Sequence, residues 1–320
     1  MRYVNGQRLV EKPGRANPLP ARPFRGKCHI RLSGKTTYTE KTDHMPKRLT
    51  EAQQAAYQRD GFVAPIDIFT ADEVAQIHAE LDAAEAAHGE QLQAAGRNNA
   101  HYVLPVLDRI AHDQRILDAV EDVIGPDILV AGTTLFIKEP ETTGFISWHQ
   151  DARYIGLEPH DWVTAWLAIS DVNEENGCMR MVPGTHAASL VDHVDTFGED
   201  NMLTRGQTVP DVDEAATVPV PLKPGQLSLH HPRVVHGSGP NRSGKRRVGF
   251  AIQSYITPAV EQVIGKIWVQ TARGTDFGGH HTEAPRTTAE MAPEDIAFRD
   301  MTNDELSKIF YAGAAKKGKY

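Results

Sequence analysis

The sequence predicts a mainly β protein with flanking helices, built around an antiparallel β-sandwich or jelly roll. From residue 127 onward, short runs rich in β-branched residues are separated by turn signals such as Asn-Gly, Pro-Gly and Gly-Pro. These runs do not alternate with long helical patterns, and the sequence contains neither a G-x-G-x-x-G motif nor a P-loop. A parallel nucleotide-binding sheet is therefore disfavoured.

The composition limits the class of protein. A length of 320 residues fits one enlarged β domain as well as two average domains, and 40% hydrophobic with 24% charged residues is ordinary for a soluble globular protein. The net charge of −8 argues against a nucleic-acid partner, because a phosphate backbone requires a dense basic surface. Two cysteines cannot form a four-thiolate zinc site, so any bound metal must be held by histidines and carboxylates.

Positive charge is concentrated at the N-terminus. Residues 1–48 carry 12 lysines and arginines against 3 acidic residues, whereas the remainder carries 22 against 39. We expect residues 1–48 to form a basic arm that packs on the acidic body or on a partner subunit in a homo-oligomer. Residues 49–320 are expected to form one domain, divided into a helical flank over 49–126, a β core over about 127–256 and a C-terminal extension over 257–320.

No membrane partner is predicted. No stretch approaches the ~18 consecutive apolar residues that span a bilayer, and the first residues lack the apolar run of a signal peptide. We therefore expect a cytoplasmic protein.

Capping signals and apolar periodicity predict the helices. Thr50 and Thr70 each begin a capping box. Apolar residues at helical spacing predict one helix over about 71–88 and another over about 113–124. From about residue 293, the sequence predicts two short helices.

Six strands are expected in the β region, each with alternate side chains on opposite faces. They cover the segments 128–138, 162–170, 178–182, 226–230, 233–238 and 246–255.

Two separated segments of the β region carry residues typical of a metal centre. His149 and Asp151 are two residues apart, so on a strand they would share one face and could hold one ion. His236 lies in the second segment, and Arg247 follows it eleven residues later. Two histidines and one carboxylate that leave open positions on one side form the facial triad of non-haem Fe(II) oxygenases.

Such a centre explains why an arginine should lie nearby. The distal carboxylate of a 2-oxo diacid chelated to the iron would be buried in an apolar interior without compensation. A bidentate guanidinium pair satisfies it, and Arg247 fits this role, with Ser238 as a further hydrogen-bond donor. Arg246 would face the opposite side of a regular strand, so we prefer Arg247.

His230 and His231 compete with His236 as the distal ligand. His231 precedes Pro232, which cannot donate to a strand ladder, and neither histidine has a Gly-Ser pair and an arginine strand in register behind it. We prefer His236.

Three motifs identify a family resemblance: HQDARY, VTAWLAISDVNEENGCMRMVPGTH and HGSGPNRSGKRRVGF. Together they resemble the phytanoyl-CoA dioxygenase family of Fe(II)/2-oxoglutarate-dependent oxygenases. The resemblance covers about residues 127–256, and more weakly the helices before them. It implies a double-stranded β-helix core of the jelly-roll, cupin-like kind.

The resemblance also implies roles for individual residues. The implied iron ligands are His149, Asp151 and His236, and the implied 2-oxoglutarate residues are Arg247, Ser238, Trp166 and Thr134. Trp166 is explained equally well as a core aromatic residue. Lys138 lies on the same strand as Thr134, and we interpret it as a solvated strand end. Gln150, Arg153 and Tyr154 lie beside the metal motif and could face the substrate or lie in a surface turn. His101 lies in the polar segment 98–102 before the β region, which resembles a segment that approaches the active site in related sequences, and a surface turn explains it equally well.

The resemblance implies an enzyme that hydroxylates an aliphatic C–H bond of a small-molecule substrate. Fe(II) would be its cofactor, and O2 and 2-oxoglutarate its cosubstrates, with 2-oxoglutarate decarboxylated to succinate. One alternative is a cupin-like metal-dependent isomerase or a 2-oxoglutarate-independent dioxygenase, neither of which requires Arg247. Another is a non-catalytic module that binds a small molecule, because a fold does not fix a function.

Overall fold

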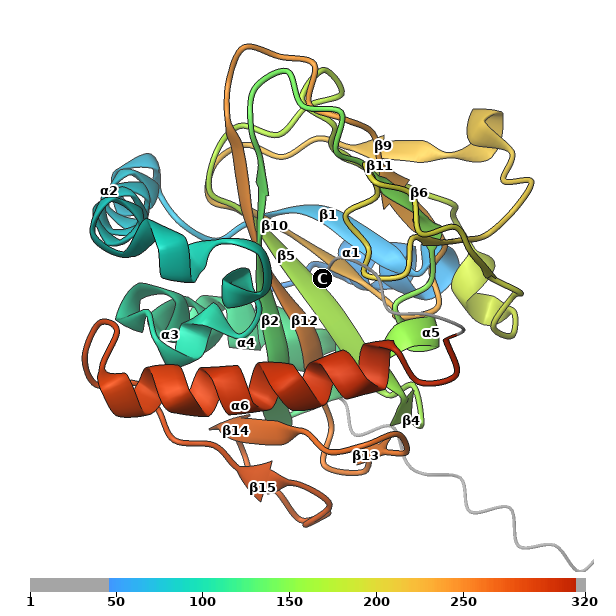
Figure 1. Cartoon of the computed structure of the whole chain (residues 1–320). Helices are drawn as coiled ribbons and strands as arrows, with labels where there is room; N and C mark the ends of the chain where they lie inside the picture. The colour runs from blue at the N-terminus through green and yellow to red at the C-terminus, as the bar shows by residue number, and fades with distance from the viewer. Residues whose placement is uncertain (1–45, 315–320) are drawn as a thin grey trace, which may run out of the picture. The chain divides into compact units, whose positions relative to one another are not determined.

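Two antiparallel β-sheets form the core of residues 46–314, the part of the chain that this computed structural model describes. The larger sheet has the strand order β1-β10-β5-β12-β2-β14-β15, and the smaller sheet has the order β3-β11-β6-β9 (Figure 1). Only β14 and β15 pair in parallel among the neighbouring strands of these two sheets in the described part. Trp166 and Ala251 of the larger sheet share a hydrophobic cluster with Met181 of the smaller one, so the two sheets pack face to face.

The larger sheet consists of β1 Phe62–Asp67, β10 Gln226–His230, β5 Trp162–Ala168, β12 Arg247–Ile256, β2 Ile128–Lys138, β14 Trp268–Arg273 and β15 Thr282–Glu283. The smaller sheet consists of β3 Ile146–His149, β11 His236–Ser238, β6 Met179–Met181 and β9 Val218–Val220. Two short pairs accompany them, β4 Leu157–Glu158 with β13 Glu261–Gln262, and β7 Val194–Asp195 with β8 Gln207–Thr208.

The helices are α1 Glu51–Asp60, α2 Ala71–His88, α3 Pro105–Ala111, α4 Gln114–Ile124, α5 Ala152–Ile155 and α6 Pro293–Phe310. Short 3-10 turns, among them Ala94–Arg97 and Ala100–Tyr102, connect α2 to α3. Both predicted capping boxes are present, because Thr50 and Thr70 each accept a backbone hydrogen bond and the third helical residue reaches back to the cap.

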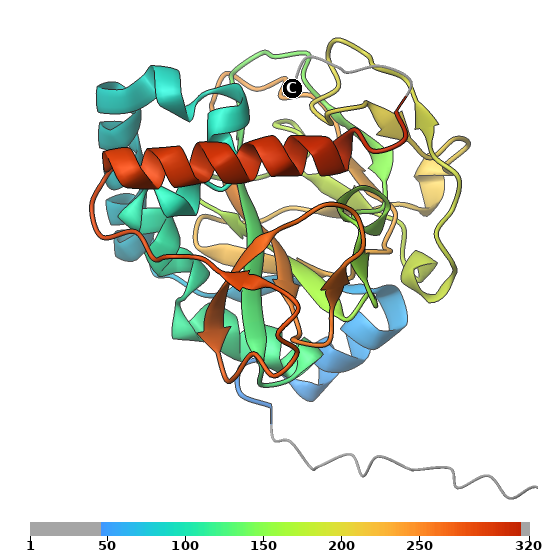
Figure 2. The same ribbon diagram turned by 60° about the horizontal axis from the view of Figure 1, so that its bottom comes forward.

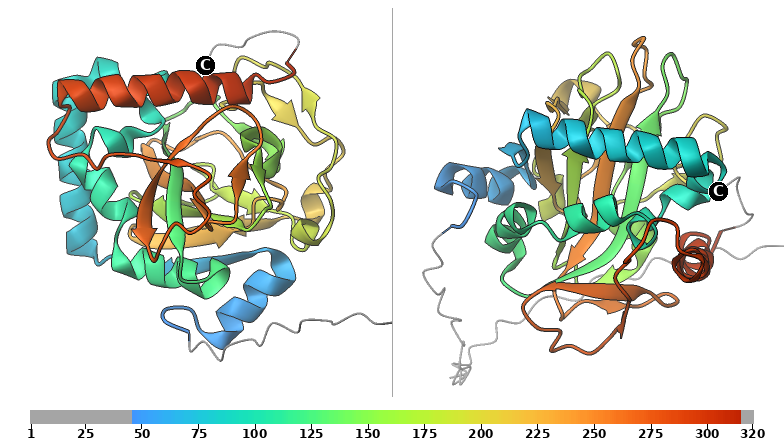
Figure 3. Two further views of the ribbon diagram at one scale, coloured as in Figure 1. Left: turned by 90° about the horizontal axis from the view of Figure 1, so that it is seen from below. Right: turned by 90° about the vertical axis from the view of Figure 1, so that its left-hand side faces the viewer.

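Strand alternation divides the side chains of the larger sheet between its two faces. On one face, apolar residues pack in a single cluster with residues of α1 to α4, and Figure 3 shows these helices beside the sheet. In β5 and β12 the members of this cluster are Val163, Ala165, Leu167, Val248, Phe250, Ile252 and Tyr255. The intervening residues point toward the smaller sheet. Thr164, Trp166 and Arg247 therefore reach the space between the two sheets.

The C-terminal segment forms one helix and not the two short helices predicted. α6 is continuous over 18 residues from Pro293 to Phe310, and Figure 2 shows it crossing the strands. Asn303 lies in the middle of this helix and donates hydrogen bonds to the backbone oxygens of Ala95 and Asn98, at 3.0 and 3.1 Å. Because this tertiary contact is distant in sequence, local propensity does not reveal it.

The predicted basic arm lies almost entirely outside the described residues. Its last three residues are described, and the final two bind acidic groups of α4. Lys47 Nζ lies 2.8 Å from Glu121, and the backbone nitrogen of Arg48 donates to Asp122 at 2.8 Å. Packing of the rest of the arm, and assembly of the chain into a homo-oligomer, stay predictions.

No helix among residues 46–314 combines the length and the apolar character that crossing a membrane requires.

Candidate active site

His149 and His236 lie opposite each other on neighbouring strands of the smaller sheet. They are register partners on β3 and β11, and their ring centroids are 4.1 Å apart. Gly237 permits this approach, because a Cβ there would lie 3.0 Å from the backbone oxygen of Ile146. The strand pairing therefore brings together two histidines that are 87 positions apart in the sequence.

Hydrogen bonds fix the orientation of both rings. Nδ1 of His149 lies 2.8 Å from the backbone oxygen of Ser147, and Nδ1 of His236 lies 3.0 Å from that of Val234. A carbonyl oxygen can only accept, so each Nδ1 carries the hydrogen and each Nε2 of a neutral ring offers a lone pair. Burial lowers the pKa of His236 to about 3, helped by the neighbouring His149, so its ring is neutral near pH 7.

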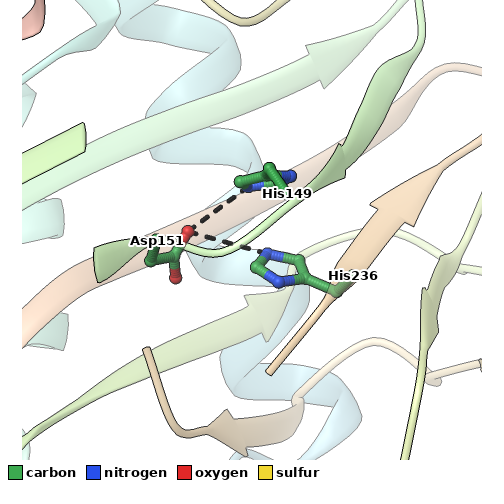
Figure 4. A group of neighbouring side chains, drawn as sticks. All are labelled: His149, Asp151 and His236. Atoms are coloured by element: carbon green, nitrogen blue, oxygen red, sulfur yellow. Dashed lines mark ion pairs between the residues drawn. The ribbon is translucent and has the colours of Figure 1, made fainter. Parts of the chain in front are cut away.

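Asp151 completes the cluster from the turn that follows β3. Its Oδ1 lies 3.3 Å from Nε2 of His149 and 3.7 Å from Nε2 of His236 (Figure 4). The chain leaves the strand at His149, so Asp151 has helical backbone angles at the start of α5 and not the strand position that the spacing suggested. Burial alone would raise the pKa of Asp151, but the facing His236, His149 and His230 hold it well below its ordinary value.

These three side chains suit a divalent transition metal. Their ligand atoms all lie within 4.8 Å of one another. In the tautomers set by the backbone carbonyls, two imidazole lone pairs and a carboxylate oxygen face a common point without a hydrogen between them. A bound cation relieves that repulsion, and the 2-His-1-carboxylate set is the one that Fe(II) oxygenases use.

Arg247 and Lys138 are buried side by side at another part of the site. They are register partners on β12 and β2, and each is 1% exposed. Lys138 donates to Ser238 Oγ at 2.8 Å and to the backbone oxygen of Gly239, while Arg247 donates to the backbone oxygen of Gly177. Within residues 46–314, neither cation forms an ion pair with a carboxylate, and Nε of Arg247 has no hydrogen-bond partner. An anionic ligand would compensate both charges.

The interpretation of Lys138 as a solvated strand end is wrong. The turn after β11 covers the end of β2, and Ser238 and Gly239 enclose the ammonium group. Burial, together with the neighbouring Arg247, lowers the pKa of Lys138 to about 6. Burial also lowers the pKa of Arg247, to about 10.

Trp166 packs against the buried guanidinium of Arg247. The guanidinium carbon of Arg247 is 5.1 Å from the centroid of its ring. Gly249 allows this packing, because a Cβ at that position would lie 1.9 Å from Cζ2 of Trp166. Trp166 therefore belongs to the core cluster between the sheets and lines the site as well.

A single cavity of about 530 Å³ connects these groups. Among the predicted residues, those that line it are His149, Asp151, His236, Arg247, Ser238, Trp166, Thr134 and Tyr154. The opposite wall comes from α6 through Leu306, Ser307 and Phe310, and from the segments 93–98 and 202–204. The cavity therefore extends from Arg247, past the histidines, to the C-terminal helix.

Three residues proposed to face the substrate do not line this cavity. The Gln150 side chain is turned to the backbones of Arg233 and Val191, at 2.7 and 2.9 Å. Arg153 is exposed on α5. His101 is fully buried and lies 2.8 Å from Thr133 Oγ1, and Thr133 occupies the strand position next to the cavity-lining Thr134.

Sequence reasoning missed several residues that line the site. Asn98 and Gln253 both place a side-chain oxygen 2.9 Å from Thr134 Oγ1 inside the cavity. Asn98 lies in the same polar segment, 98–102, as His101. The sequence therefore predicted the correct segment, but with His101 in place of Asn98 as the residue that faces the substrate. Position 253 continues the alternation from Arg247 and could have been inferred from strand parity.

A family model described as Phytanoyl-CoA dioxygenase (PhyH) matches residues 57–249. The chain belongs to this family. The match confirms the predicted family and the predicted class of enzyme, an oxygenase that uses Fe(II) and 2-oxoglutarate.

Two curated relatives illustrate the range of this family. A protein of Stutzerimonas stutzeri named probable alpha-ketoglutarate-dependent hypophosphite dioxygenase is 28% identical over 226 residues, which cover 62% of this chain and 77% of the relative. The human peroxisomal phytanoyl-CoA dioxygenase is 33% identical over 133 residues, which cover 40% of this chain and 39% of the human protein. This chain therefore aligns with only about two fifths of the human relative.

Solved structures confirm the jelly-roll fold of this PhyH-family chain. The non-heme monooxygenase ThoJ, in its apo form, has a TM-score of 0.72 and 32% identity, and the match covers 81% of this chain and 98% of ThoJ. EctD from S. alaskensis, solved with 2-oxoglutarate and 5-hydroxyectoine, has a TM-score of 0.55 and 21% identity over 79% of this chain and 89% of EctD. The likeness to EctD concerns the fold alone.

Proposed function

We propose that this enzyme hydroxylates an aliphatic C–H bond of a small molecule and decarboxylates 2-oxoglutarate to succinate in the same turnover. His149, Asp151 and His236 would hold Fe(II), and Arg247 would bind the distal carboxylate of 2-oxoglutarate. The observation that carries the proposal is a set of three convergent ligand atoms that shares one cavity with the buried Arg247, which has no carboxylate partner among residues 46–314 and has the buried Lys138 as its strand partner. The bound iron would supply the activation of O2.

The metal ligands are prepared by their surroundings. The carbonyl oxygens of Ser147 and Val234 keep Nδ1 of each histidine protonated, so Nε2 is the only nitrogen that each ring can offer to a metal. The low pKa of Asp151 keeps its carboxylate ionised, and this charge offsets part of the charge of a divalent cation. Binding of the metal therefore requires no proton to leave His236 or Asp151 near neutral pH.

The buried cations favour 2-oxoglutarate over the alternative functions. A cupin-like isomerase or a 2-oxoglutarate-independent dioxygenase has no use for Arg247 in a wall of the metal cavity, nor for the buried Lys138 beside it. A dicarboxylate that binds the metal at one end places its second carboxylate at a distance, where a guanidinium and an ammonium can neutralise it. Ser238 lines the same region and is within hydrogen-bond distance of Lys138, so its hydroxyl can contribute to the same carboxylate.

The remaining part of the cavity would receive the substrate. Leu306 and Phe310 of α6, with Met202 and Leu203, give it an apolar wall, whereas the amides of Asn98 and Gln253 add hydrogen-bonding groups. We therefore expect a substrate with a sizeable apolar surface and at least one hydrogen-bonding group. Tyr154 packs edge-on against His149, with ring centroids 5.7 Å apart, and would separate the substrate from the outer side of the metal.

Substrate-stimulated release of succinate tests this proposal. Purified enzyme with Fe(II) and 2-oxoglutarate would be screened against a panel of metabolites, and each positive reaction would be repeated under 18O2. We expect the product to gain one labelled oxygen atom and to form in step with succinate. A product that is an isomer of its substrate, or turnover that does not need 2-oxoglutarate, would contradict hydroxylation.

A further inference from the structure

The two oxygens of the Asp151 carboxylate have different partners. Oδ1 faces Nε2 of His149 and of His236, at 3.3 and 3.7 Å. Oδ2 lies 2.8 Å from Thr164 Oγ1 and 3.2 Å from Nε2 of His230. One oxygen therefore faces the other two proposed ligands, and the second meets groups that can donate hydrogen bonds.

Thr164 and His230 form a matched pair on the larger sheet. They are register partners on β5 and β10, and both are buried. The proposed histidine ligands lie on the smaller sheet, so Asp151 is contacted from both sheets. The register of β5 with β10 places the two groups on Oδ2 together.

The chemistry of each group supports donation to Oδ2. His230 Nδ1 is buried and has no hydrogen-bond partner in the described part of the chain, which is consistent with a neutral ring that carries its hydrogen on Nε2. The Thr164 hydroxyl lies 2.8 Å from both Asp151 Oδ2 and the backbone oxygen of Gln253. It has one hydrogen, and the carboxylate is the stronger acceptor of the two. Thr164 and His230 are therefore both placed to donate to Oδ2. The described part of the chain gives the His230 ring no other hydrogen-bond partner, whereas Thr164 has a second acceptor.

We propose that His230, supported by Thr164, is a positioning residue that holds Asp151 so that only Oδ1 binds the metal. The inference rests on the metal centre proposed above. A carboxylate can bind a cation through one oxygen or through both. Oδ2 engaged by two donors is not free to act as a second ligand atom, so Asp151 leaves more of the coordination sphere open for 2-oxoglutarate and O2.

His230 is not a fourth ligand in this arrangement. Among residues 46–314, the group whose ligand atoms all lie within 4.8 Å of one another contains His149, Asp151 and His236 but not His230. The His230 ring is near that of His236, with centroids 4.6 Å apart, but its Nε2 is directed to the oxygen of Asp151 that does not face the other ligands. Its contact with the proposed centre therefore runs through Asp151.

Substitution of His230 by leucine and by glutamine separates the hydrogen bond from packing. His230→Leu removes the donor, whereas the side-chain amide of His230→Gln can place an N–H near the position of Nε2. His231→Gln is the matched control one position along the chain, because the His231 ring packs against His186, with centroids 5.5 Å apart. Each protein would be titrated with Co(II) as the metal probe, by calorimetry and by visible absorption, and its melting temperature measured without metal.

We expect His230→Leu to weaken Co(II) binding by about 10- to 100-fold, the usual effect of removing a group that orients a metal ligand. Its Co(II) spectrum should also change, because both oxygens of Asp151 become available. His230→Gln should recover most of the affinity and the original spectrum, and His231→Gln should match the wild type. Unchanged affinity and spectrum in His230→Leu would overturn the inference, as would an equal loss in His230→Gln.

A second pair of variants covers the case in which His230→Leu does not fold. Thr164→Val keeps the shape of the side chain and removes the hydroxyl, and Thr164→Ser restores a donor. Weaker Co(II) binding in the valine variant, with recovery in the serine variant, supports the inference, and equal binding in both contradicts it. These measurements require no turnover. If wild type binds Co(II) but shows no 2-oxoglutarate-dependent reaction, the proposed function fails while the role of His230 is still decided.

Discussion

Arg247 and Lys138 face each other across neighbouring antiparallel strands; both are buried, and Arg247 lines the active-site cavity. Two adjacent cations inside a protein repel each other and lose hydration, so protonation of both groups is costly in the free enzyme. The lowered pKa of each group expresses this cost, and a pKa of about 6 leaves Lys138 largely neutral near pH 7 in the free enzyme. An incoming dicarboxylate would remove it, which makes this pair the feature that most clearly distinguishes a cosubstrate pocket from a packed core.

Replacement of Arg247 should weaken 2-oxoglutarate binding. Arg247→Ala would leave the distal carboxylate without its guanidinium partner, and loss of one member of a buried pair costs about 3–5 kcal/mol. We therefore expect the Michaelis constant for 2-oxoglutarate to rise by roughly two to three and a half orders of magnitude, at about 1.4 kcal/mol per tenfold change. Steady-state succinate release at varied 2-oxoglutarate would measure the effect.

Arg246 supplies the matched control for this variant. It is the neighbouring residue, but its guanidinium pairs with Glu85 at 2.5 Å and Glu139 at 3.0 Å on the other side of the strand. Arg246→Ala should leave the Michaelis constant for 2-oxoglutarate unchanged. A large effect of Arg246→Ala together with a small effect of Arg247→Ala would reverse the assignment.

Lys138 should make folding stability depend on pH. Its pKa is about 6 in the folded protein against an ordinary value of 10.5, so the unfolded chain binds more protons between these two values. The free energy of unfolding should therefore fall as the pH is lowered from about 10 toward 6, by up to about 1.4 kcal/mol per pH unit for one proton. Denaturant unfolding of wild type and Lys138→Met across this range would show the slope only in wild type. Parallel pH profiles would count against a buried, largely neutral lysine.

Gly249 should be indispensable for the position of Trp166. A Cβ at residue 249 would lie 1.9 Å from Trp166 Cζ2, so Gly249→Ala must displace the indole. Overpacking of this kind costs about 1–3 kcal/mol, and a lower melting temperature would report it. The control is Gly244→Ala, because a Cβ at that position meets nothing within 4 Å. Equal melting temperatures for the two variants would contradict the close packing.

The sequence predicted those parts of the site that depend on strand register. His236 and Arg247 were found because alternation along a strand fixes which side chains share a face. His149 was found in the same way, whereas Asp151 was correctly grouped with it although the strand ends before residue 151. Local spacing was sufficient for these residues because each lies within a few positions of a regular strand.

Other parts of the site depend on contacts between distant segments. The burial of Lys138 follows from a turn 100 positions away that covers the end of its strand. The role inferred for His230 depends on its pairing with Thr164, and the single helix α6 depends on its docking to the segment around Asn98. No local pattern reports such contacts, so the lysine was interpreted as solvated and the helix was divided in two.

A substitution in the cavity wall formed by α6 should impair turnover of the substrate and leave the affinity for 2-oxoglutarate unchanged. Leu306 lines the cavity, so Leu306→Trp would fill part of the region assigned to the substrate. We expect substrate-stimulated succinate release to fall at least tenfold, equivalent to about 1.4 kcal/mol, while the affinity for 2-oxoglutarate stays the same. Met301→Trp on the exposed side of the same helix is the control and should retain activity. Loss of 2-oxoglutarate affinity in Leu306→Trp would show that the two regions are not separate.

His149, Asp151 and His236 are proposed to hold one Fe(II) ion to which 2-oxoglutarate binds with its far end on Arg247. Anaerobic titration with Fe(II) and then 2-oxoglutarate tests it most directly, because a 2-oxo acid chelated to Fe(II) gives a weak charge-transfer band in visible light. We predict that the band forms only when both are present, is lost in Asp151→Ala, and needs far more 2-oxoglutarate in Arg247→Ala. Absence of the band in the wild type, or a band of equal strength in Asp151→Ala, would contradict the claim.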